Sequence, residues 1–242
     1  MTLPDAPRIY ALIAATWPAA QSFRVGPWTI RDGQGGGSRV SAATADGAFS
    51  IDGLPQAERA MRDLGQTPQF MIRQSDNALD DLLATAGYVV KDPVTLYAAP
   101  VDLIATQRPK AATNFTAWPP LAAQCEVWAD GGIGPSRLAV MDRAPLPKTT
   151  ILTRADERCA GGTFVGIDGN CAMIHALEIG AGFRRRGLAR QTTIAAAFWA
   201  KAQGAAYLTL VTTDANKAAN ALYSSLGMQV VGHYHYRISP EG

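Results

Sequence analysis

Two short segments of the chain share one pattern, in which an apolar helix ends at a glycine and a strand follows. Residues 82–88 (LLATAGY) align with residues 222–228 (LYSSLGM), glycine on glycine, and each segment lies between strand-like runs. An asparagine precedes each glycine at a similar distance, Asn77 by ten positions and Asn216 by eleven. The repetition predicts an internal duplication with one unit per about 110–120 residues, which is the size of a typical domain.

The N-terminal half alternates helical and strand-like segments. Helices are expected at residues 7–16, 55–64 and 77–86, and strands at 28–31, 39–43, 69–73 and 94–98. No helix start follows the glycine-rich stretch at 32–37, so we interpret it as the connection of a hairpin rather than a phosphate-binding loop. Residues 105–120 contain three prolines and are the expected linker.

The C-terminal half continues the alternation. Strands are expected at residues 124–129, 149–154, 162–167, 171–179, 207–212 and 228–238, and helices at 136–143, 187–203 and 216–226. Strands that alternate with helices in this way predict an α/β layer fold. With the linker, the duplication predicts two tandem domains, residues 1–110 and 111–242.

Composition excludes several classes of protein. A hydrophobic fraction of 48%, a charged fraction of 17% and a net charge of +2 rule out intrinsic disorder. No apolar run approaches the roughly 20 residues of a membrane-spanning helix, so no membrane partner is expected. The N-terminal segment lacks a basic n-region, and we expect no secretory signal. Three cysteines without metal-type spacing (Cys125, Cys159 and Cys171) predict a reducing, cytoplasmic location.

Positive charge is concentrated in one place. Residues 1–120 carry 10 basic and 11 acidic side chains, whereas residues 121–242 carry 12 basic and 9 acidic ones. Four of those twelve are Arg184, Arg185, Arg186 and Arg190. Such a spot suits a small anion better than nucleic acid, which needs charge spread along a face.

The segment 184–189 (RRRGLA) follows a strand and opens a helix. Backbone N–H groups at a helix start lack partners and the helix dipole adds positive potential, so phosphate binds there readily. Gly187 and Ala189 are small enough to let a phosphate approach the backbone. A Walker loop is excluded because Gly-Lys-Ser/Thr is absent. A dinucleotide fingerprint from Gly180 is excluded because Arg185 stands where it needs glycine.

The helix at 216–226 presents two polar side chains on one face. Asn216 and Tyr223 lie seven positions apart, two helical turns, while Leu222 and Leu226 form a neighbouring stripe that can pack on the sheet. Tyr223 then either points its phenol toward the group held by the arginine loop or lies at the rim of the core with its hydroxyl on a backbone group.

Together these two segments resemble the signature segments of the GCN5-related N-acetyltransferase (GNAT) family. The chain has Arg-x-x-Gly-x-Ala after a strand and then Asn-x-x-Ala-x-x-Leu-Tyr-x-x-x-Gly-Met, about 30 residues later. The resemblance covers residues 121–242. It implies two tandem acyl-CoA N-acyltransferase-like domains, each with a mixed, mostly antiparallel sheet flanked by helices. It also implies transfer of an acetyl group from acetyl-CoA to a primary amine, without a metal.

The resemblance also implies residue roles. The pyrophosphate of acyl-CoA is expected on Arg184, Arg185, Arg186, Gly187, Leu188 and Ala189. The backbone from Leu177 to Ile179 is expected to pair with pantetheine and to polarise the thioester carbonyl, and Asn216 to help hold the coenzyme arm. Tyr223 is expected to protonate the departing thiolate, which its ordinary pKa of about 10 permits at neutral pH.

The N-terminal half departs from the family pattern. Between the strand expected to end near Ile51 and the helix at 55–64 there is no Arg-x-x-Gly-x-Gly/Ala, and Leu83 stands where Tyr223 stands in the second copy. Leucine has no proton to donate. We therefore expect a degenerate first copy that supports the second domain or walls part of its acceptor pocket.

Glu178 and His175 are the candidates for the base that takes a proton from the amine. They differ by three positions, so they are expected on opposite faces of the sheet, and Glu178 is favoured because it is closer to the thioester. Each has a structural interpretation beside the functional one. Glu178 can be paired with an arginine, and His175 can be a hydrogen-bonded core histidine.

Other interpretations stay open. His233 and His235 share a strand face and could suggest a metal, but without a third ligand a half-buried strand with Tyr234 and Tyr236 opposite is the preferred interpretation. A non-catalytic acyl-CoA-binding regulatory protein and an anion- or nucleic-acid-binding module are the alternative functions. The acceptor can be a small amine, an amino acid, a peptide N-terminus or a lysine side chain, and the oligomeric state is open.

Overall fold

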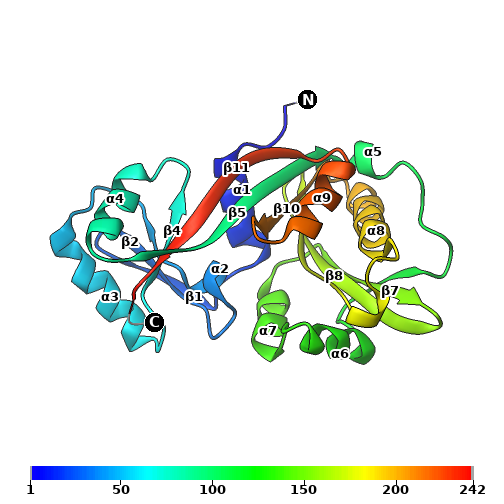
Figure 1. The fold of residues 1–242 in the computed structure, drawn as a ribbon, viewed down its shortest axis with the longest axis horizontal. Helices are drawn as coiled ribbons and strands as arrows, with labels where there is room; N and C mark the ends of the chain where they lie inside the picture. Colours follow the sequence, from blue (N-terminus) through cyan, green and yellow to red (C-terminus); the bar gives the residue numbers. More distant parts are fainter. Residues whose placement is uncertain (1, 241–242) are drawn as a thin grey trace.

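An eight-stranded sheet runs through the computed structural model, which describes residues 2–240 (Figure 1). Along the sheet the order is β4 (Gln69–Arg73), β11 (Gln229–Ile238), β5 (Val89–Pro100), β10 (Tyr207–Thr213), β9 (Cys171–Ile179), β8 (Arg158–Asp168), β7 (Lys148–Ala155) and β6 (Asn114–Ala117). Neighbours in it are antiparallel except β9 and β10, which are parallel. The mixed, mostly antiparallel sheet implied by the resemblance is confirmed.

The last strand of each half is inserted beside strands of the other half. β5, from the N-terminal half, pairs with β10 on one side and with β11 on the other. β11 pairs in turn with β5 and with β4. Figure 1 shows the two exchanged strands running side by side across the molecule. Residues 94–99 of β5 are all buried, as expected for a central strand covered on both faces. Backbone hydrogen bonds therefore join the two halves.

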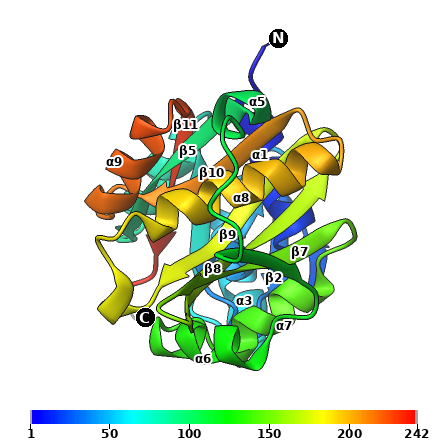
Figure 2. The ribbon, with the colours of Figure 1, turned by 90° about the vertical axis from the view of Figure 1, so that its right-hand side faces the viewer.

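Helices cover both faces of this sheet. α5 (Val101–Ile104), α8 (Leu188–Ala202) and α9 (Lys217–Ser225) share an apolar cluster with Ile174 of β9, and Figure 2 shows α8 lying across the sheet. α1 (Ala6–Thr16) shares a second cluster with Met173, and α6 (Ala122–Asp130) and α7 (Pro135–Arg143) share a third with Trp17 and Phe164. Because successive strand residues point to opposite faces, α8 and α1 lie on opposite sides of β9.

A small three-stranded sheet and four short helical elements complete the N-terminal half. They are β1 (Gln21–Val25), β2 (Trp28–Asp32), α2 (Ser38–Ser41), β3 (Thr44–Ala45), η1 (Ile51–Gly53), α3 (Leu54–Asp63) and α4 (Asn77–Thr85). A hairpin that the sequence did not predict turns at Gly26 and Pro27. The stretch 32–37 does turn, with the Gly36 N–H donating to the carbonyl of Gly33, and it lies in the connection between the antiparallel strands β2 and β3. The strand predicted at 39–43 is wrong, because most of it is α2. Tertiary packing explains the difference, because Gly36 lets Val40 approach Val140 of α7.

The other predicted elements are mostly where the sequence places them. Strands 69–73 and 171–179 are confirmed to the residue, and the helices at 55–64 and 136–143 to within one. The strand predicted at 124–129 is wrong. It is helix α6, whose buried side chains Gln124 and Trp128 lie four positions apart, a helical spacing. Within residues 2–240, no helix combines the length and the apolar character needed to cross a bilayer.

The shared sheet predicts that residues 111–242 produced alone will not unfold cooperatively. Without β5, facing edges of β10 and β11 lose their hydrogen-bond partners and Leu96 leaves the core. Circular dichroism during heating would measure this, with co-expression of residues 1–110 as the control that should restore one transition. A fragment that melts cooperatively at the temperature of the full chain would contradict the prediction.

Candidate active site

The parallel strands β9 and β10 separate part of the way along their length. Their pairing runs from Cys171 and Tyr207 to Ile174 and Leu210 and then stops. Both strands continue beyond that point, to Ile179 and Thr213. The final residues of β9 therefore have no β10 partner on this edge, and their backbone groups are available to a ligand that enters between the strands.

A β-bulge in β9 lies where the separation begins. The register with β8 shifts between Gly162 and Phe164, and Ala176 has a left-handed φ of 50°. The indole Nε1 of Trp128 donates to the carbonyl of Ala176 at 2.9 Å and holds the bulge against α6. The bulge turns the end of β9 away from β10. The sequence did not predict it, because alanine is not a residue type that favours left-handed backbone.

The bulge also corrects the prediction about the two candidate bases. His175 lies opposite Phe164 and Glu178 lies opposite Gly162, two residues along β8. Since alternate residues of a strand share a face, His175 and Glu178 point to the same face of the sheet, not to opposite faces. This is the face of α1, α6 and α7.

His175 is a buried, fully bonded histidine. Arg39 Nη1 lies 3.2 Å from His175 Nδ1, and since arginine can only donate, Nδ1 is the acceptor. Nε2 then carries the hydrogen and donates to Thr16 Oγ1 at 2.8 Å, and Thr16 donates to the carbonyl of Leu12. The ring also stacks on Trp17, with centroids 4.9 Å apart. Burial lowers the pKa of His175 well below its usual value, and the charge of Arg39 lowers it further.

Glu178 is paired with an arginine of the loop. Arg184 Nη2 lies 3.0 Å from Glu178 Oε1, and Arg184 Nε donates to the carbonyl of Ile179 at 3.0 Å. The Glu178 side chain is 20% exposed and lies against Gly131, where a Cβ would come within 2.7 Å of it. Glycine at this position leaves room for the carboxylate at the end of α6.

The loop between β9 and α8 leaves a row of backbone donors unpaired. After η2 (Ala181–Phe183), the N–H groups of residues 185–190 have no acceptor within the described chain. Arg185 and Gly187 both have left-handed backbone, with φ of 64° and 76°. Left-handed residues that alternate with others turn successive N–H groups toward one side, which makes an anion-binding concavity. At Gly187 nothing lies within 4 Å of a Cβ position, so the approach is open.

The four arginines of the sequence cluster differ in their partners. Arg186 makes a bidentate ion pair with Asp156, at 2.6 and 2.8 Å. Arg190 donates to Ser225 of α9 at 3.3 Å. Of the four, Arg185 alone has no hydrogen-bond or ion-pair partner in the part of the chain that the structure describes. Leu188 is buried beside Ile179, and Ala189 packs on the same cluster.

Tyr223 is buried on the other side of the sheet from Glu178. Its ring lies 5.8 Å from that of Tyr97, a residue of the exchanged strand β5, and it packs in one cluster with Leu177. Burial raises the pKa of Tyr223 above its usual value, and Tyr97 adds to the shift. Within residues 2–240 its hydroxyl has no hydrogen-bond partner, which leaves the proton available to a ligand.

Asn216 is the N-cap of α9. Its Oδ1 accepts from the backbone N–H of Ala219 at 3.1 Å, which leaves its Nδ2 hydrogens for another partner. Asn220, which the sequence did not single out, accepts from the hydroxyl of Tyr97 at 2.9 Å and donates to the carbonyl of Thr213. These bonds fix the start of α9 against the end of β10.

The N-terminal half repeats this order of elements. β3, α3, β4 and α4 correspond to β9, α8, β10 and α9, and Ala43 forms a parallel bridge with Phe70 of β4 as β9 does with β10. The strand expected to end near Ile51 ends earlier, at Ala45. Leu83, at the position of Tyr223, is fully buried.

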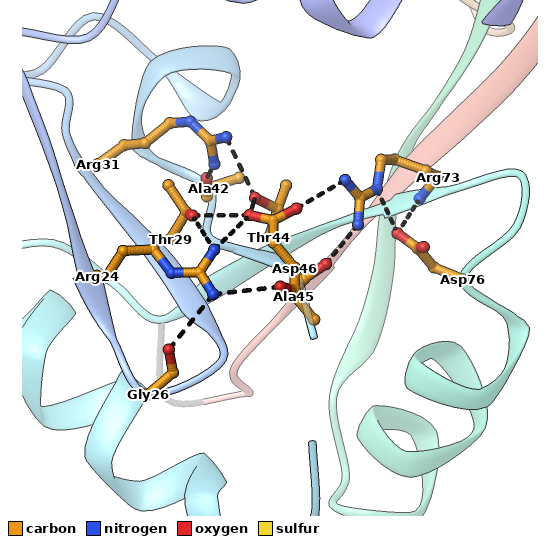
Figure 3. A network of polar contacts seen from close by, with 10 residues as sticks. All are labelled: Arg24, Gly26, Thr29, Arg31, Ala42, Thr44, Ala45, Asp46, Arg73 and Asp76. Carbon is orange, nitrogen blue, oxygen red and sulfur yellow. Dashed lines mark hydrogen bonds and ion pairs between the residues drawn. The ribbon is translucent and has the colours of Figure 1, made fainter. Parts of the chain in front are cut away.

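Arg73 closes the gap beyond that bridge (Figure 3). Its guanidinium donates to the carbonyl of Ala45, to Asp46 at 3.0 Å and to Asp76 at 2.8 Å, so it ties the end of β3 to the end of β4. Burial raises the pKa of Asp46, but hydrogen bonds from Thr29 and Arg73 outweigh this and lower it. The place that is open between β9 and β10 is filled by ion pairs here.

This arrangement, with a parallel pair that opens beside a loop of free N–H groups, places the protein in the class of GNAT-like folds. Residues 118–228 match the family model described as the acetyltransferase (GNAT) family, so this part of the chain is similar to that family. A relative in Bacillus subtilis (strain 168), named "Uncharacterized N-acetyltransferase YobR", is 28% identical over 98% of this chain and 99% of its own length.

Solved structures extend the fold likeness to both halves. A GCN5-related N-acetyltransferase from Kribbella flavida is 18% identical, with a TM-score of 0.67 over 98% of this chain and 96% of that one. A tandem GNAT protein from the clavulanic acid biosynthesis pathway is 12% identical, with a TM-score of 0.64 over 99% of this chain and 90% of that one. The tandem arrangement is thus shared along almost the whole chain.

The neutral, buried His175 predicts a loss of stability in mild acid. The unfolded chain takes up a proton at this histidine below pH about 6.5, whereas the folded chain does not, so the free energy of unfolding falls as pH drops. This group contributes a slope of up to about 1.4 kcal/mol per pH unit. Urea unfolding between pH 8 and 5 would measure it. His175→Gln should lose this contribution, and His233→Gln, at an exposed histidine, should keep it. Equal slopes in all three proteins would contradict the prediction.

Proposed function

We propose that this protein transfers an acetyl group from acetyl-CoA to a primary amine, by direct attack of the amine in a ternary complex. The observation that carries the proposal is the open end of β9 and β10 beside the free N–H groups of residues 185–190. An acyl-CoA needs such a pair of features, a slot that accepts its pantetheine amides and a cradle for its pyrophosphate. The match of residues 118–228 to the GNAT family model supports the same activity.

The coenzyme would be held mainly by backbone. The N–H groups of Arg185, Arg186, Gly187, Leu188 and Ala189 would bind the pyrophosphate, and the unpaired charge of Arg185 would add to it. Arg184, whose Nε donates to the carbonyl of Ile179 and anchors the loop to β9, would add its charge to the pyrophosphate site. The backbone of Leu177 and Ile179 would pair with pantetheine, and Asn216 would contribute its free amide hydrogens. When bound, acetyl-CoA supplies the activated acetyl group.

Tyr223 and Glu178 would transfer protons on opposite faces of the sheet. Tyr223 stays protonated because burial raises its pKa, and its unpartnered hydroxyl would donate that proton to the leaving thiolate. Glu178 faces the side of α6 and α7, where the amine would approach, and its carboxylate would accept the amine proton. The hydrogen bonds of His175 leave it no free acceptor, so we do not assign it this role.

We further propose one coenzyme site per chain. Arg73 fills the corresponding gap in the first copy, and Leu83 replaces the tyrosine there. Residues 1–110 would then be a degenerate domain and residues 111–242 the catalytic one. The first copy would contribute β5 to the second and wall part of its acceptor side. The cysteines, all unpaired, and the use of acetyl-CoA support a cytoplasmic location.

Calorimetric titration with acetyl-CoA tests the site. The wild-type chain should bind one molecule, and Gly187→Glu should weaken binding by at least about tenfold, because it places a carboxylate before the N–H groups. Gly204→Glu is the matched control, since Gly204 ends the same helix, has φ of 84° and also has open space around it. Both variants carry the same backbone strain, so only the place differs.

The titration tests the number of coenzyme sites separately from the acetyltransferase activity. Two molecules per chain would contradict the degenerate first copy. Absence of binding to the wild-type chain would contradict the acetyltransferase proposal as a whole.

Tyr223→Phe should lower kcat by about a hundredfold and leave the Kd of acetyl-CoA unchanged, because it removes the proton donor but keeps the ring. Since its pKa is raised, wild-type kcat should not fall through loss of this proton up to pH about 10. Steady-state kinetics of CoA release would measure both. Tyr207→Phe, at a buried tyrosine bonded to Thr2, is the control and should stay near wild type. An unchanged kcat in Tyr223→Phe would refute the role of this residue.

A further inference from the structure

The glycine-rich stretch at 33–37 joins the two halves on the face of the sheet that carries Glu178. A Cβ at Gly36 would lie 2.7 Å from a methyl of Val140 and 2.8 Å from one of Val40, so α2 and α7 meet at this glycine. Gly35 lies against Ser136 of α7 in the same way. The glycine-rich stretch of the first copy thus packs on α7 of the second copy, on the face of β9 that carries Glu178.

Three arginines surround this junction. Arg39 follows it on α2, while Arg137 and Arg143 lie three positions before and after Val140, on the same side of α7. Arg137 Nη2 comes within 3.7 Å of a Cβ position at Gly37, two residues from Arg39. Arg143 Nη1 reaches Gln34 of the same stretch at 3.5 Å.

No carboxylate neutralises these three guanidinium groups among residues 2–240. Arg39 donates to the neutral His175, Arg143 to the amide of Gln34, and Arg137 has no polar partner there. By contrast, Arg73, Arg184 and Arg186 each make an ion pair. Positive charge gathered without a counter-charge favours an anionic ligand.

Unpaired buried donors point the same way. Five buried side-chain atoms in the described residues lack a hydrogen-bond partner, and three are Arg39 Nε, Arg143 Nε and Arg143 Nη2. The other two, on Gln69 and Gln124, are acceptors. All the buried donors left over therefore belong to this junction. Buried polar groups are almost always satisfied, so these donors are left for a water or a ligand group that accepts hydrogen bonds.

The junction lies close to the proposed site of acetyl transfer. Arg39 touches His175, and His175 and Glu178 occupy successive positions on the same face of β9. Such positions are about 7 Å apart along a strand. A small molecule is therefore long enough to span the separation between Glu178 and the His175 that Arg39 contacts. The neutral, stacked His175 holds the Arg39 side chain without cancelling its charge.

We infer that Arg39 and Arg137, with Arg143 behind them, bind an anionic group of the acceptor, so that the acceptor is a small amine carrying a carboxylate or a phosphate a few bonds from its amino group. This inference rests on the proposed acetyltransferase function and narrows its substrate class. Guanidinium groups recognise either anion by paired, charge-assisted hydrogen bonds. Specificity for the acceptor then comes partly from the first copy, which supplies Arg39.

Matched pairs of amines test the inference. CoA release would be followed with glycine and glycinamide, leucine and leucinamide, glutamate and its diamide, and O-phosphoethanolamine and ethanolamine. The anionic member of at least one pair should react with a kcat/KM about ten- to a hundredfold above its neutral partner. The amino acid pairs and the phosphoethanolamine pair distinguish a carboxylate from a phosphate.

Two variants locate the effect. Arg39→Gln and Arg137→Gln should each raise the KM for the anionic acceptor about tenfold or more, with the Kd of acetyl-CoA unchanged. Arg39→Lys should recover part of the loss. Arg137 is exposed, so its replacement tests the inference even if Arg39→Gln disturbs packing around His175. Arg59→Gln, an exposed arginine of α3, is the control and should behave like wild type.

The failures are distinguishable. If acetyl-CoA does not bind in calorimetry, the proposed function fails. If acetyl-CoA binds but neutral partners react as well as anionic ones, or Arg39→Gln and Arg137→Gln leave the KM unchanged, the inference alone is overturned. It is likewise overturned if no anionic member of the panel reacts or binds at millimolar concentration while acetyl-CoA binds.

Discussion

Backbone hydrogen bonds from β5 to both β10 and β11 hold the two halves of this chain in one sheet. β5 is covered on both faces, so its N–H and C=O groups have no alternative partner in water. The bonds place Tyr97 of the first copy against Tyr223 of the second. They also position the first copy so that Arg39 of α2 contacts His175. The candidate site is thus assembled from both halves.

The second constraint is the bulge at Ala176. A parallel pair of regular strands would hydrogen-bond along its full length and leave no slot. One extra residue in β9, held by Trp128, ends the pairing after Ile174 and also returns Glu178 to the face of His175. The opening between β9 and β10 and the position of the carboxylate therefore have one cause, a local departure from strand geometry that α6 stabilises.

The two copies share an order of elements but differ at the end of the parallel bridge. Both have a parallel bridge followed by a helix and a strand, but in the first copy Arg73, Asp46 and Asp76 fill the space beyond the bridge with ion pairs. A single guanidinium that bonds both strand ends contributes to stability where the second copy leaves its backbone unpaired. The first copy also contacts the second directly, where α2 and the glycine-rich stretch before it meet α7.

The sequence determined the local pattern: most helices and strands, the free N–H groups implied by RRRGLA, and the paired motif that resembles the GNAT signature. These follow from side-chain periodicity, from glycine and from helix-end chemistry, which act over a few residues. Only the tertiary structure decided the strand exchange, the helix at Ala122–Asp130, the shared face of His175 and Glu178, and the approach of Arg137 to Gly37, two residues before Arg39. Each of these depends on contacts between residues distant in sequence, and a one-residue bulge reverses the face of every residue after it, which strand alternation alone cannot reveal.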